Sequence, residues 1–310
     1  MSVSGHKSES SLHSYWAPSL TSRKRWSSVL CQNVQPLEER SSNISAPPAK
    51  RQTPGMGRTS GFSSAHFNRN HTMKLESLLF LVLAPVLIHC YCDLPADCSD
   101  IYKDQSNTSG VYTIYPVGST SGVQVYCDMT SEGGHWTVIQ RRMDDSQNFY
   151  RPWCDYKTGF GAAAGEYWLG LENIFHVTLR QRYELLVDME DFEGKKVFAR
   201  YSSFSIDPES YGYKLQVSGF TDGGAGDSLT FHSGQKFSTM DKDQDASSST
   251  NCARLYLGAF WYSDCHYTNP NGIYRRGADS TISYVGVEWY TFKGYQYSLK
   301  SISMKIRPVK

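Results

Sequence analysis

Three aspartates at alternate positions, Asp241, Asp243 and Asp245, place three carboxyl groups within five residues of the chain. Carboxylates this close repel one another unless a cation lies among them, and calcium binds flexible loops that offer several oxygen ligands. The spacing therefore predicts a calcium site, with a solvated acidic turn before a helix as the alternative. An EF-hand loop is excluded, because the sixth and twelfth positions counted from Asp241 are Ala246 and Cys252 in place of glycine and glutamate.

No spacing of residues indicates an enzyme. The sequence contains no G-x-S-x-G elbow, no H-E-x-x-H pair and no G-x-x-x-x-G-K-[ST] loop. His266, next to Cys265, is more simply the wall of a pocket than a general base. After residue 72 the chain carries 22 Lys plus Arg against 27 Asp plus Glu, and this negative balance disfavours nucleic acid as a partner. We therefore predict a binding protein without enzymatic activity.

The chain of 310 residues changes character at about residue 73. Residues 1–72 carry a net charge of +6, are rich in Ser, Pro and Arg and lack apolar periodicity, so we predict a disordered upstream extension. Met73-Lys74 and the apolar stretch that follows predict a signal peptide over 73–90, too short to span a bilayer stably. This makes Met73 the expected start and the protein secreted; a signal anchor behind a basic tail and a chance apolar run are the alternatives.

Cleavage near residue 90 leaves six cysteines, Cys92, Cys98, Cys127, Cys154, Cys252 and Cys265. They form no C-x-x-C pair and no histidine cluster accompanies them, so a disulfide framework fits the pattern better than zinc. The residues alone leave about fifteen pairings open. Secretion would also expose the sequon at Asn107 to glycosylation.

The elements that must position these residues are mainly short strands. Period-two alternation predicts strands at 123–127, 136–142, 183–190, 197–201, 213–217 and 302–306. Helical signals are limited to 168–176 and a turn within 245–255, and the glycine-rich segment 218–236 is predicted to be a loop. The expected class is α+β, dominated by antiparallel sheet.

Motifs spread over about residues 95–309 resemble the fibrinogen C-terminal (fibrinogen-related) domain family. They occur in the family's order and include Cys98-Ser-Asp-Ile, Gly133-Gly-His-Trp, Gly165-Glu-Tyr-Trp, Asn251-Cys-Ala and Asn271-Gly. The resemblance implies a short linker at 91–94 and one globular domain over 95–310. That domain would have a small disulfide subdomain, a central twisted sheet with short helices, and a loop-rich subdomain for calcium and ligand.

The resemblance also implies the calcium ligands. The carboxylates of Asp243 and Asp245 are expected to bind Ca²⁺ together with the backbone carbonyls of Ser247 and Ser249. Asp241 is expected to take a supporting or capping place. The chain has one residue more before Cys252 than the family usually has.

A pocket for acetyl groups of sugars is expected beside the calcium. By the resemblance it is formed by Tyr256, Cys265, His266, Tyr284 and Val285. Aromatic rings suit the methyl group and the sugar face, and backbone amides around Cys265 suit the carbonyl oxygen. The peptide bond before this cysteine is cis in the family. Simple core packing of the rings is the alternative.

The resemblance implies two disulfides within the chain, Cys98 with Cys127 and Cys252 with Cys265. Two cysteines remain. An interchain bond at Cys92 would give a disulfide-linked homo-oligomer, whereas a bond between Cys92 and Cys154 would remove that link.

The function implied is that of a secreted, calcium-dependent binding protein. Its expected partners are acetylated carbohydrates and extracellular-matrix components such as microfibrils, elastin and collagen, in matrix assembly or innate recognition. The rival hypothesis is a structural matrix cross-linking protein without a functional acetyl-sugar pocket.

Overall fold

The computed structural model describes residues 94–103, 106–118, 121–281 and 283–309. All of them belong to one unit, Thr53–Lys310. The predictions for residues 1–72, for the signal peptide at 73–90 and for Cys92 lie outside the described residues. Within the described ranges, no helix is long and apolar enough to cross a bilayer.

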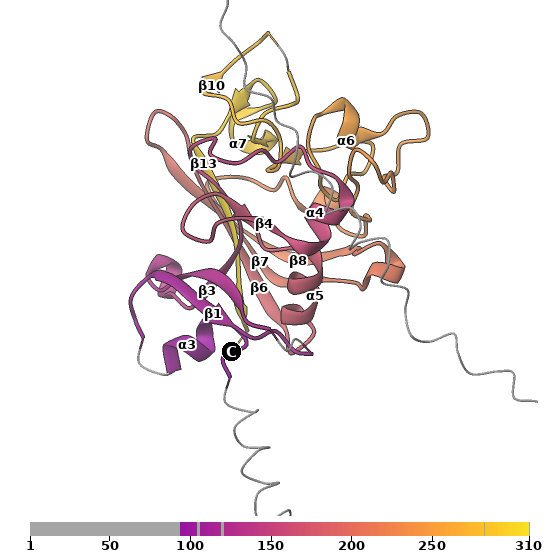
Figure 1. Ribbon diagram of the computed structural model, residues 1–310. Helices are drawn as coiled ribbons and strands as arrows, with labels where there is room; N and C mark the ends of the chain where they lie inside the picture. Colours follow the sequence, from indigo (N-terminus) through magenta and orange to yellow (C-terminus); the bar gives the residue numbers. More distant parts are fainter. Residues whose placement is uncertain (1–93, 104–105, 119–120, 282, 310) are drawn as a thin grey trace, which may run out of the picture. The chain divides into compact units, whose positions relative to one another are not determined.

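An antiparallel sheet of nine strands organises the domain (Figure 1). Its strands run in the order β1-β2-β3-β13-β6-β7-β8, and β5 joins β4 to β3. Their bounds are β1 (Gly110–Ile114), β2 (Val123–Asp128), β3 (Trp136–Arg142), β4 (Phe160–Gly161), β5 (Tyr167–Trp168), β6 (Tyr183–Glu190), β7 (Lys196–Ile206), β8 (Leu215–Gly223) and β13 (Ser301–Pro308). The last strand in sequence therefore lies at the centre of the sheet. This architecture confirms the predicted α+β class.

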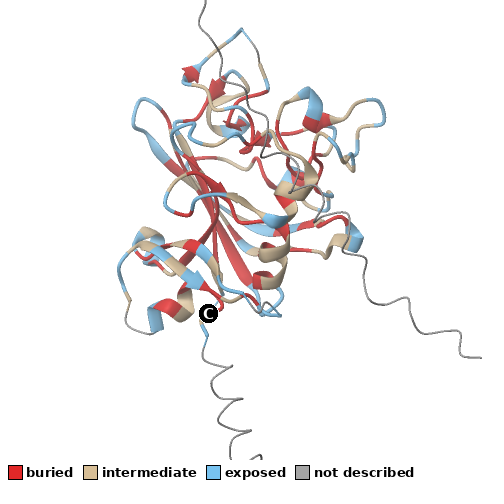
Figure 2. Cartoon of the chain, in the orientation of Figure 1, coloured by how far each residue is buried: buried red, intermediate tan, exposed pale blue. Residues whose placement is uncertain are grey.

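The two faces of the sheet differ because side chains alternate along each strand. In β6, Leu185 and Val187 are fully buried in the apolar core, and helix α5 (Leu171–Thr178) packs on this side. On the opposite face, Glu184 accepts hydrogen bonds from Arg200 and from Arg307. Figure 2 shows buried residues concentrated along the central strands.

Two element boundaries differ from the sequence prediction. The helix begins at Leu171 instead of 168, because Trp168 pairs with β3 and Gly170, at φ 101°, turns the chain between strand and helix. Strand β8 begins at Leu215 and continues through the glycine-rich segment to Gly223, paired with β7. Its start is delayed because Tyr213 has φ 49°, outside the strand region.

Short elements complete the domain. They are α3 (Cys98–Lys103), α4 (Trp153–Thr158), α6 (Cys252–Leu255), α7 (Tyr290–Lys293), the 3₁₀ turns η2 (Ser131–Gly133), η3 (Glu209–Tyr211) and η4 (Thr230–His232), and the strand pairs β9 (Thr268–Asn269) with β11 (Glu288–Trp289) and β10 (Gly277–Ala278) with β12 (Tyr297–Ser298). Residues 225–300 are largely loops. Hydrogen bonds from side chains of the sheet therefore contribute to fixing their conformation.

A buried arginine ties these loops to the sheet. Arg142, at the end of β3, donates hydrogen bonds to the carbonyls of Pro270 (3.1 Å) and Gly272 (2.6 Å). Its Nε lies 3.5 Å from Glu166, and both side chains are at most 1% exposed. Glu166 also accepts hydrogen bonds from three backbone N–H groups. The segment around 270–272 is thereby fixed to the end of β3.

Candidate calcium and ligand site

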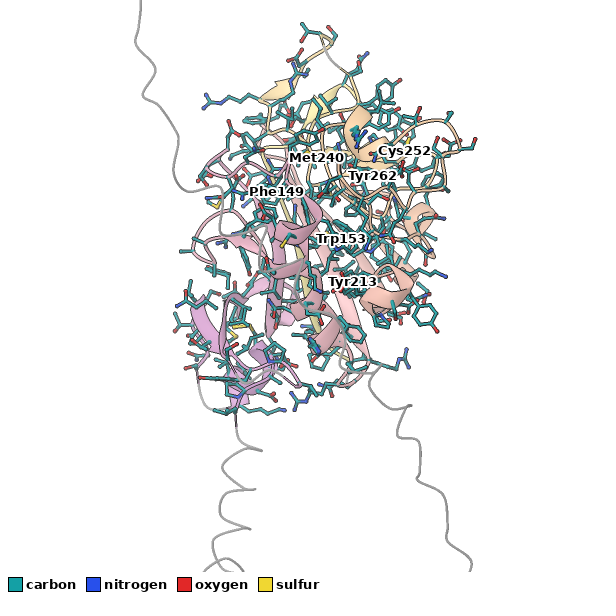
Figure 3. All side chains as sticks on the ribbon, turned by 45° about the vertical axis from the view of Figure 1, so that its right-hand side comes forward. Phe149, Trp153, Tyr213, Met240, Cys252 and Tyr262 are labelled. Atoms are coloured by element: carbon teal, nitrogen blue, oxygen red, sulfur yellow. A yellow bond between two sulfur atoms is a disulfide. The ribbon has the colours of Figure 1, made fainter. Side chains whose placement is uncertain are left out.

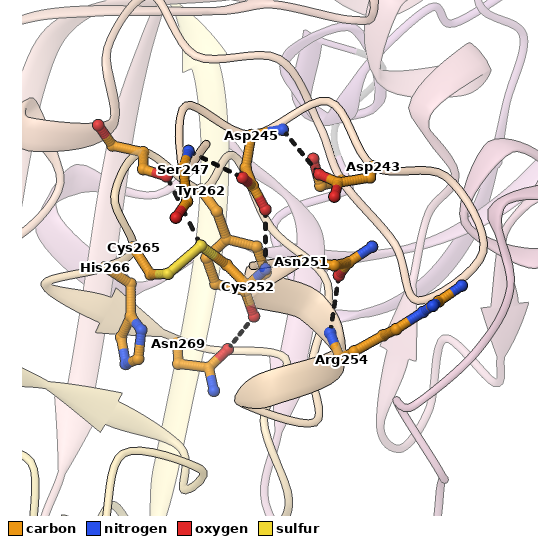
Figure 4. The surroundings of a disulfide bond; sticks show 12 residues. Asp243, Asp245, Ser247, Asn251, Cys252, Arg254, Tyr262, Cys265, His266 and Asn269 are labelled. Carbon is orange, nitrogen blue, oxygen red and sulfur yellow. Dashed lines mark hydrogen bonds between the residues drawn. A yellow bond between two sulfur atoms is a disulfide. The ribbon is translucent and has the colours of Figure 1, made fainter. Parts of the chain in front are cut away.

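Asp243 and Asp245 lie side by side in the loop before α6 (Figure 4). The N–H of Asp245 donates to the Asp243 carboxylate at 3.3 Å. The Asp245 carboxylate accepts hydrogen bonds from the N–H groups of Ser247 (3.0 Å) and Cys252 (2.8 Å). Burial raises the pKa of Asp245, and the neighbouring Asp243 raises it further, although the two N–H groups act in the opposite direction. The negative charge of Asp243 therefore makes ionisation of Asp245 less favourable when no cation is bound.

Asp241 lies apart from this pair. Its carboxylate accepts hydrogen bonds from the N–H of Trp153 (2.8 Å) at the start of α4 and from the hydroxyl of Thr239 (2.7 Å). The indole of Trp153 packs 5.7 Å from the ring of Tyr213 (Figure 3). The Nζ atom of Lys242 lies over the same indole, 3.7 Å from the ring centroid. Asp241 therefore links the acidic loop to α4, which fits the supporting place expected for it.

The oxygen atoms around Asp245 suit a calcium ion better than a softer metal. The described residues contain no group of three acidic, histidine or cysteine side chains, so side chains alone would supply two carboxylates, those of Asp243 and Asp245. The carbonyls of Ser247 and Ser249 accept no hydrogen bond from the described part of the chain. Two carboxylates and backbone carbonyls form a hard oxygen set, and calcium completes such sets with water. The residues present therefore fit the ion.

The disulfide between Cys252 and Cys265 joins this loop to the expected pocket. Its Cα atoms are 5.6 Å apart. One end donates the N–H that binds Asp245, and the other end precedes His266. Asn251 caps the intervening helix α6 by accepting the N–H of Arg254 at 2.8 Å. The acid pair and the pocket thus share one short covalent loop.

The second predicted disulfide is also present. Cys98 and Cys127 join α3 to β2, with 5.5 Å between their Cα atoms. Both pairings implied by the family resemblance are therefore confirmed. Cys154, in α4, is disulfide-bonded as well, and none of the four cysteines above is its partner.

Three of the predicted pocket residues come together around the ring of His266. Tyr256 meets it edge to face at 4.6 Å, and Tyr284 lies 6.1 Å from Tyr256. Tyr295 completes the group, at 5.7 Å from His266 and 4.6 Å from Tyr284. The sequence analysis missed Tyr295, because its place depends on loop packing and no local periodicity indicates it.

The remaining two predicted residues contribute backbone groups. Val285 is buried, and its carbonyl accepts a hydrogen bond from the N–H of Ile273 at 2.8 Å. The peptide bond between Asp264 and Cys265 is cis. The N–H groups of Cys265 and His266 donate to no acceptor within the described ranges, although the Cys265 carbonyl accepts from Ser263. Two hydrogen-bond donors therefore lie next to the aromatic rings.

Glu288 is a second residue that the sequence analysis missed. Its carboxyl oxygen lies 3.2 Å from Nε2 of His266, with both side chains 2% exposed. Burial raises the pKa of Glu288 to about 8, against the effects of the Gly286 N–H and Arg275, and burial lowers the pKa of His266 to about 3. Burial thus disfavours the charged form of each group, and Nδ1 of His266 has no hydrogen-bond partner among the described residues.

Asn107, the expected glycosylation residue, is exposed between α3 and β1. An attached glycan would point into solvent at this position. Its modification stays a prediction.

Comparison with known proteins gives consistent matches. Residues 94–309 match the family described as "Fibrinogen beta and gamma chains, C-terminal globular domain". Microfibril-associated glycoprotein 4 of Bos taurus is 57% identical over 220 residues, covering 69% of this chain and 85% of the relative, and that of Homo sapiens is 55% identical with the same shares. The solved fibrinogen-like globe domain of human ANGPTL2 is 46% identical, with a TM-score of 0.67, covering 69% of this chain and 99% of that one.

Proposed function

The chain belongs to the family of fibrinogen C-terminal globular domains, and from this membership we propose that it is a secreted, calcium-dependent binding protein for acetylated glycans and extracellular-matrix components. The names of its matrix relatives support an extracellular-matrix location and a role without catalysis. Microfibrils, elastin and collagen are the proposed matrix partners, in matrix assembly or innate recognition.

One observation carries the acetyl-binding proposal. The N–H groups of Cys265 and His266 have no protein acceptor in the described chain, and they adjoin a group of aromatic rings. A hydrogen-bond donor pair next to apolar ring surface matches an acetyl group, whose carbonyl oxygen accepts hydrogen bonds and whose methyl group prefers apolar contact. Tyr256 and Tyr284 would contact the methyl group.

Calcium would act on this pocket through the loop that it orders. Asp243 and Asp245 would supply its carboxylates, and Ser247 and Ser249 its backbone carbonyls. When bound, the ion supplies positive charge that relieves the repulsion between the two acids. Asp245 in turn holds the N–H of Cys252, so the loop up to His266 would keep its conformation.

Affinity capture on acetylated beads tests the proposal. We expect the secreted protein to be retained in calcium and released both by a chelator and by free acetate. The variant Tyr256→Ala should lose retention while keeping its calcium-dependent rise in melting temperature. Matrix-fibre binding that persists in chelator and in acetate, with no retention on the beads, would instead support a structural cross-linking protein without a functional pocket.

A further inference from the structure

A cleft opens in the sheet where β2 separates from β3. Among the described residues, β2 pairs with β1 over residues 123–127 but with β3 only over residues 127–128. Next to this short pairing the phenol of Tyr167 lies between the two strands. Its hydroxyl accepts the N–H of Tyr126 at 3.1 Å and donates to the carbonyl of Val138. The first half of β2 therefore has a partner strand on one side only.

The open side of β2 carries unused backbone groups. The backbone groups of successive residues in a strand point to alternate sides, so those of Gln124 point to the same side as the N–H of Tyr126. Neither the N–H nor the carbonyl of Gln124 forms a hydrogen bond on this side with another part of the described chain. Gln124 thus offers one donor and one acceptor to a ligand.

β4 provides a second open edge. Within the described ranges it pairs with β5 alone. The N–H of Ala162 donates to the carbonyl of Glu166 at 3.3 Å, so the backbone of Ala162 points toward β5. The neighbouring residue Gly161 therefore points its N–H and carbonyl away from β5. These two groups likewise have no partner in the parts of the chain that the structure describes.

The two open edges line one cleft of about 300 Å³. Val123 and Gln124 of β2 line it together with residues 159–163, which include β4. Tyr167 and Trp168 of β5, both buried, also line it. Donors and acceptors on two strand edges are complementary to an extended polypeptide, which pairs with such edges through backbone hydrogen bonds. The chemistry of the cleft therefore indicates a protein segment as its ligand.

Charge restricts the side chains of that segment. No acidic or basic side chain lines the cleft. The charged side chains that adjoin it are engaged within the chain: Arg151 with Asp155, Lys157 with Glu209, and Arg141 with the carbonyls of Ala163 and Gly165. A charged side chain inside the cleft would lose hydration without gaining an ion pair there. Small, uncharged side chains are therefore favoured.

We propose that this cleft binds an extended segment of a protein partner with small, uncharged side chains, which inserts as a strand between β2 and β4. The segment forms backbone hydrogen bonds with Gln124 and Gly161. The site is separate from the proposed acetyl pocket, because its lining residues lie within 123–173 and those of the pocket within 256–285. Neither the calcium loop nor the acetyl pocket contributes a residue to it.

Calorimetric titration of the full secreted chain with a blocked hexapeptide of alternating threonine and alanine tests the insertion. This peptide is uncharged, so its backbone should provide most of the affinity. Two isomers of it carry methyl groups on alternate peptide nitrogens, and each isomer lacks the donors that point to one edge. We expect both isomers to bind at least about tenfold more weakly than the parent peptide.

Ala162→Lys and Ala164→Lys form a matched pair of variants. Both alanines are exposed, but only Ala162 lines the cleft. Ala162→Lys should weaken binding of the parent peptide at least about fivefold, whereas Ala164→Lys should leave it unchanged. Binding should also be the same in calcium, in chelator and in free acetate, which distinguishes this site from the acetyl pocket. Melting temperatures within a few degrees of the parent chain would establish that the variants are folded.

Several outcomes would overturn the strand insertion. Equal affinities of the parent peptide and both isomers would mean binding without strand pairing, and a loss confined to one isomer would mean pairing with a single edge. Absence of peptide binding, or binding that Ala162→Lys leaves unchanged, would exclude the cleft as the site. Tighter binding of a peptide with glutamate in place of threonine would assign the cleft to an acidic ligand of Arg141. Failure of capture on acetylated beads would leave all these results unaffected.

Discussion

At the scale of single residues, the two acids of the loop before α6 should behave differently from Asp241. Asp243→Asn removes one charged ligand, so the calcium-dependent rise in melting temperature should be lost, while the repulsion on Asp245 in chelator is relieved. Asp241→Ala should keep the calcium response but lower the free energy of unfolding by about 1 kcal/mol, because Asp241 caps the start of α4. Scanning calorimetry with calcium and with chelator measures both. A full calcium response in Asp243→Asn would contradict the assignment.

The buried pair of Glu288 and His266 predicts a specific dependence of stability on pH. Glu288 has an ordinary pKa of 4.5 and a folded pKa of about 8, so it contributes stability that is complete below pH 4.5 and lost as the pH rises to 8. His266 has an ordinary pKa of 6.5 and a folded pKa of about 3, so its contribution is complete above pH 6.5 and lost as the pH falls to 3. Between pH 4.5 and 6.5 the two contributions to stability change in opposite directions. Above pH 6.5 only the contribution of Glu288 still changes, so the free energy of unfolding should decline there.

The substitution Glu288→Gln isolates this decline. Its amide can still accept the N–H of Gly286 and donate to His266, but it does not titrate. Urea unfolding at constant calcium should show the parent chain losing up to about 1.4 kcal/mol per pH unit above pH 6.5, with the variant losing less by that amount. Parallel pH profiles for the two proteins would show that Glu288 is ionised in the folded state.

At the scale of elements, the sequence predicted most strands of the sheet but not the side chains that loops bring to the site. The alternation in 183–190 predicted the bounds of β6, Tyr183–Glu190, because successive side chains of a strand point to opposite faces. The same rule missed the end of β8, since Gly219 and Gly223 suggest a loop although pairing with β7 continues through them. Tyr295 and Glu288 reach the site through tertiary contacts between distant loops, for which the local sequence has no signal.

The connection between β3 and the loop at 270–272 gives a prediction about an element. Arg142→Met leaves the Glu166 carboxylate buried without its cation and frees two carbonyls, so the free energy of unfolding should fall by about 3–5 kcal/mol. Adding Glu166→Gln should recover part of this loss, because the unpaired charge is gone. Denaturant titration of the single and double variants measures the effect.

A matched control for this prediction is the ion pair of Arg151 and Asp155. These side chains are 31% and 21% exposed and four residues apart, so Arg151→Met should cost less than about 1 kcal/mol. Equal losses from Arg142→Met and Arg151→Met would mean that the buried pair does not anchor the loop.

At the scale of the whole molecule, the cysteines decide whether chains are joined covalently. Cys154 is disulfide-bonded, and the bond that Cys92 makes stays a prediction. If Cys92 links two chains, electrophoresis of the secreted protein without reductant should give species larger than a monomer that collapse on reduction, and Cys92→Ser should abolish them. A parent chain that migrates as a monomer without reductant would reject the interchain bond.

The short loop closed by Cys252 and Cys265 should make calcium and glycan binding interdependent. One end of the loop donates to Asp245 and the other carries His266, so if both proposed ligands bind, ordering by either would prepare the site of the other. Linkage requires that the factor by which calcium raises glycan affinity equal the factor by which glycan raises calcium affinity. Calorimetric titration of each ligand, with and without the other, should give two equal factors greater than one.

In the double variant Cys252→Ala, Cys265→Ala, which should lose about 3 kcal/mol of stability, both factors should fall toward one, because the covalent connection is gone. Factors of one in the parent chain would mean that the two sites act independently and that calcium only stabilises its own loop.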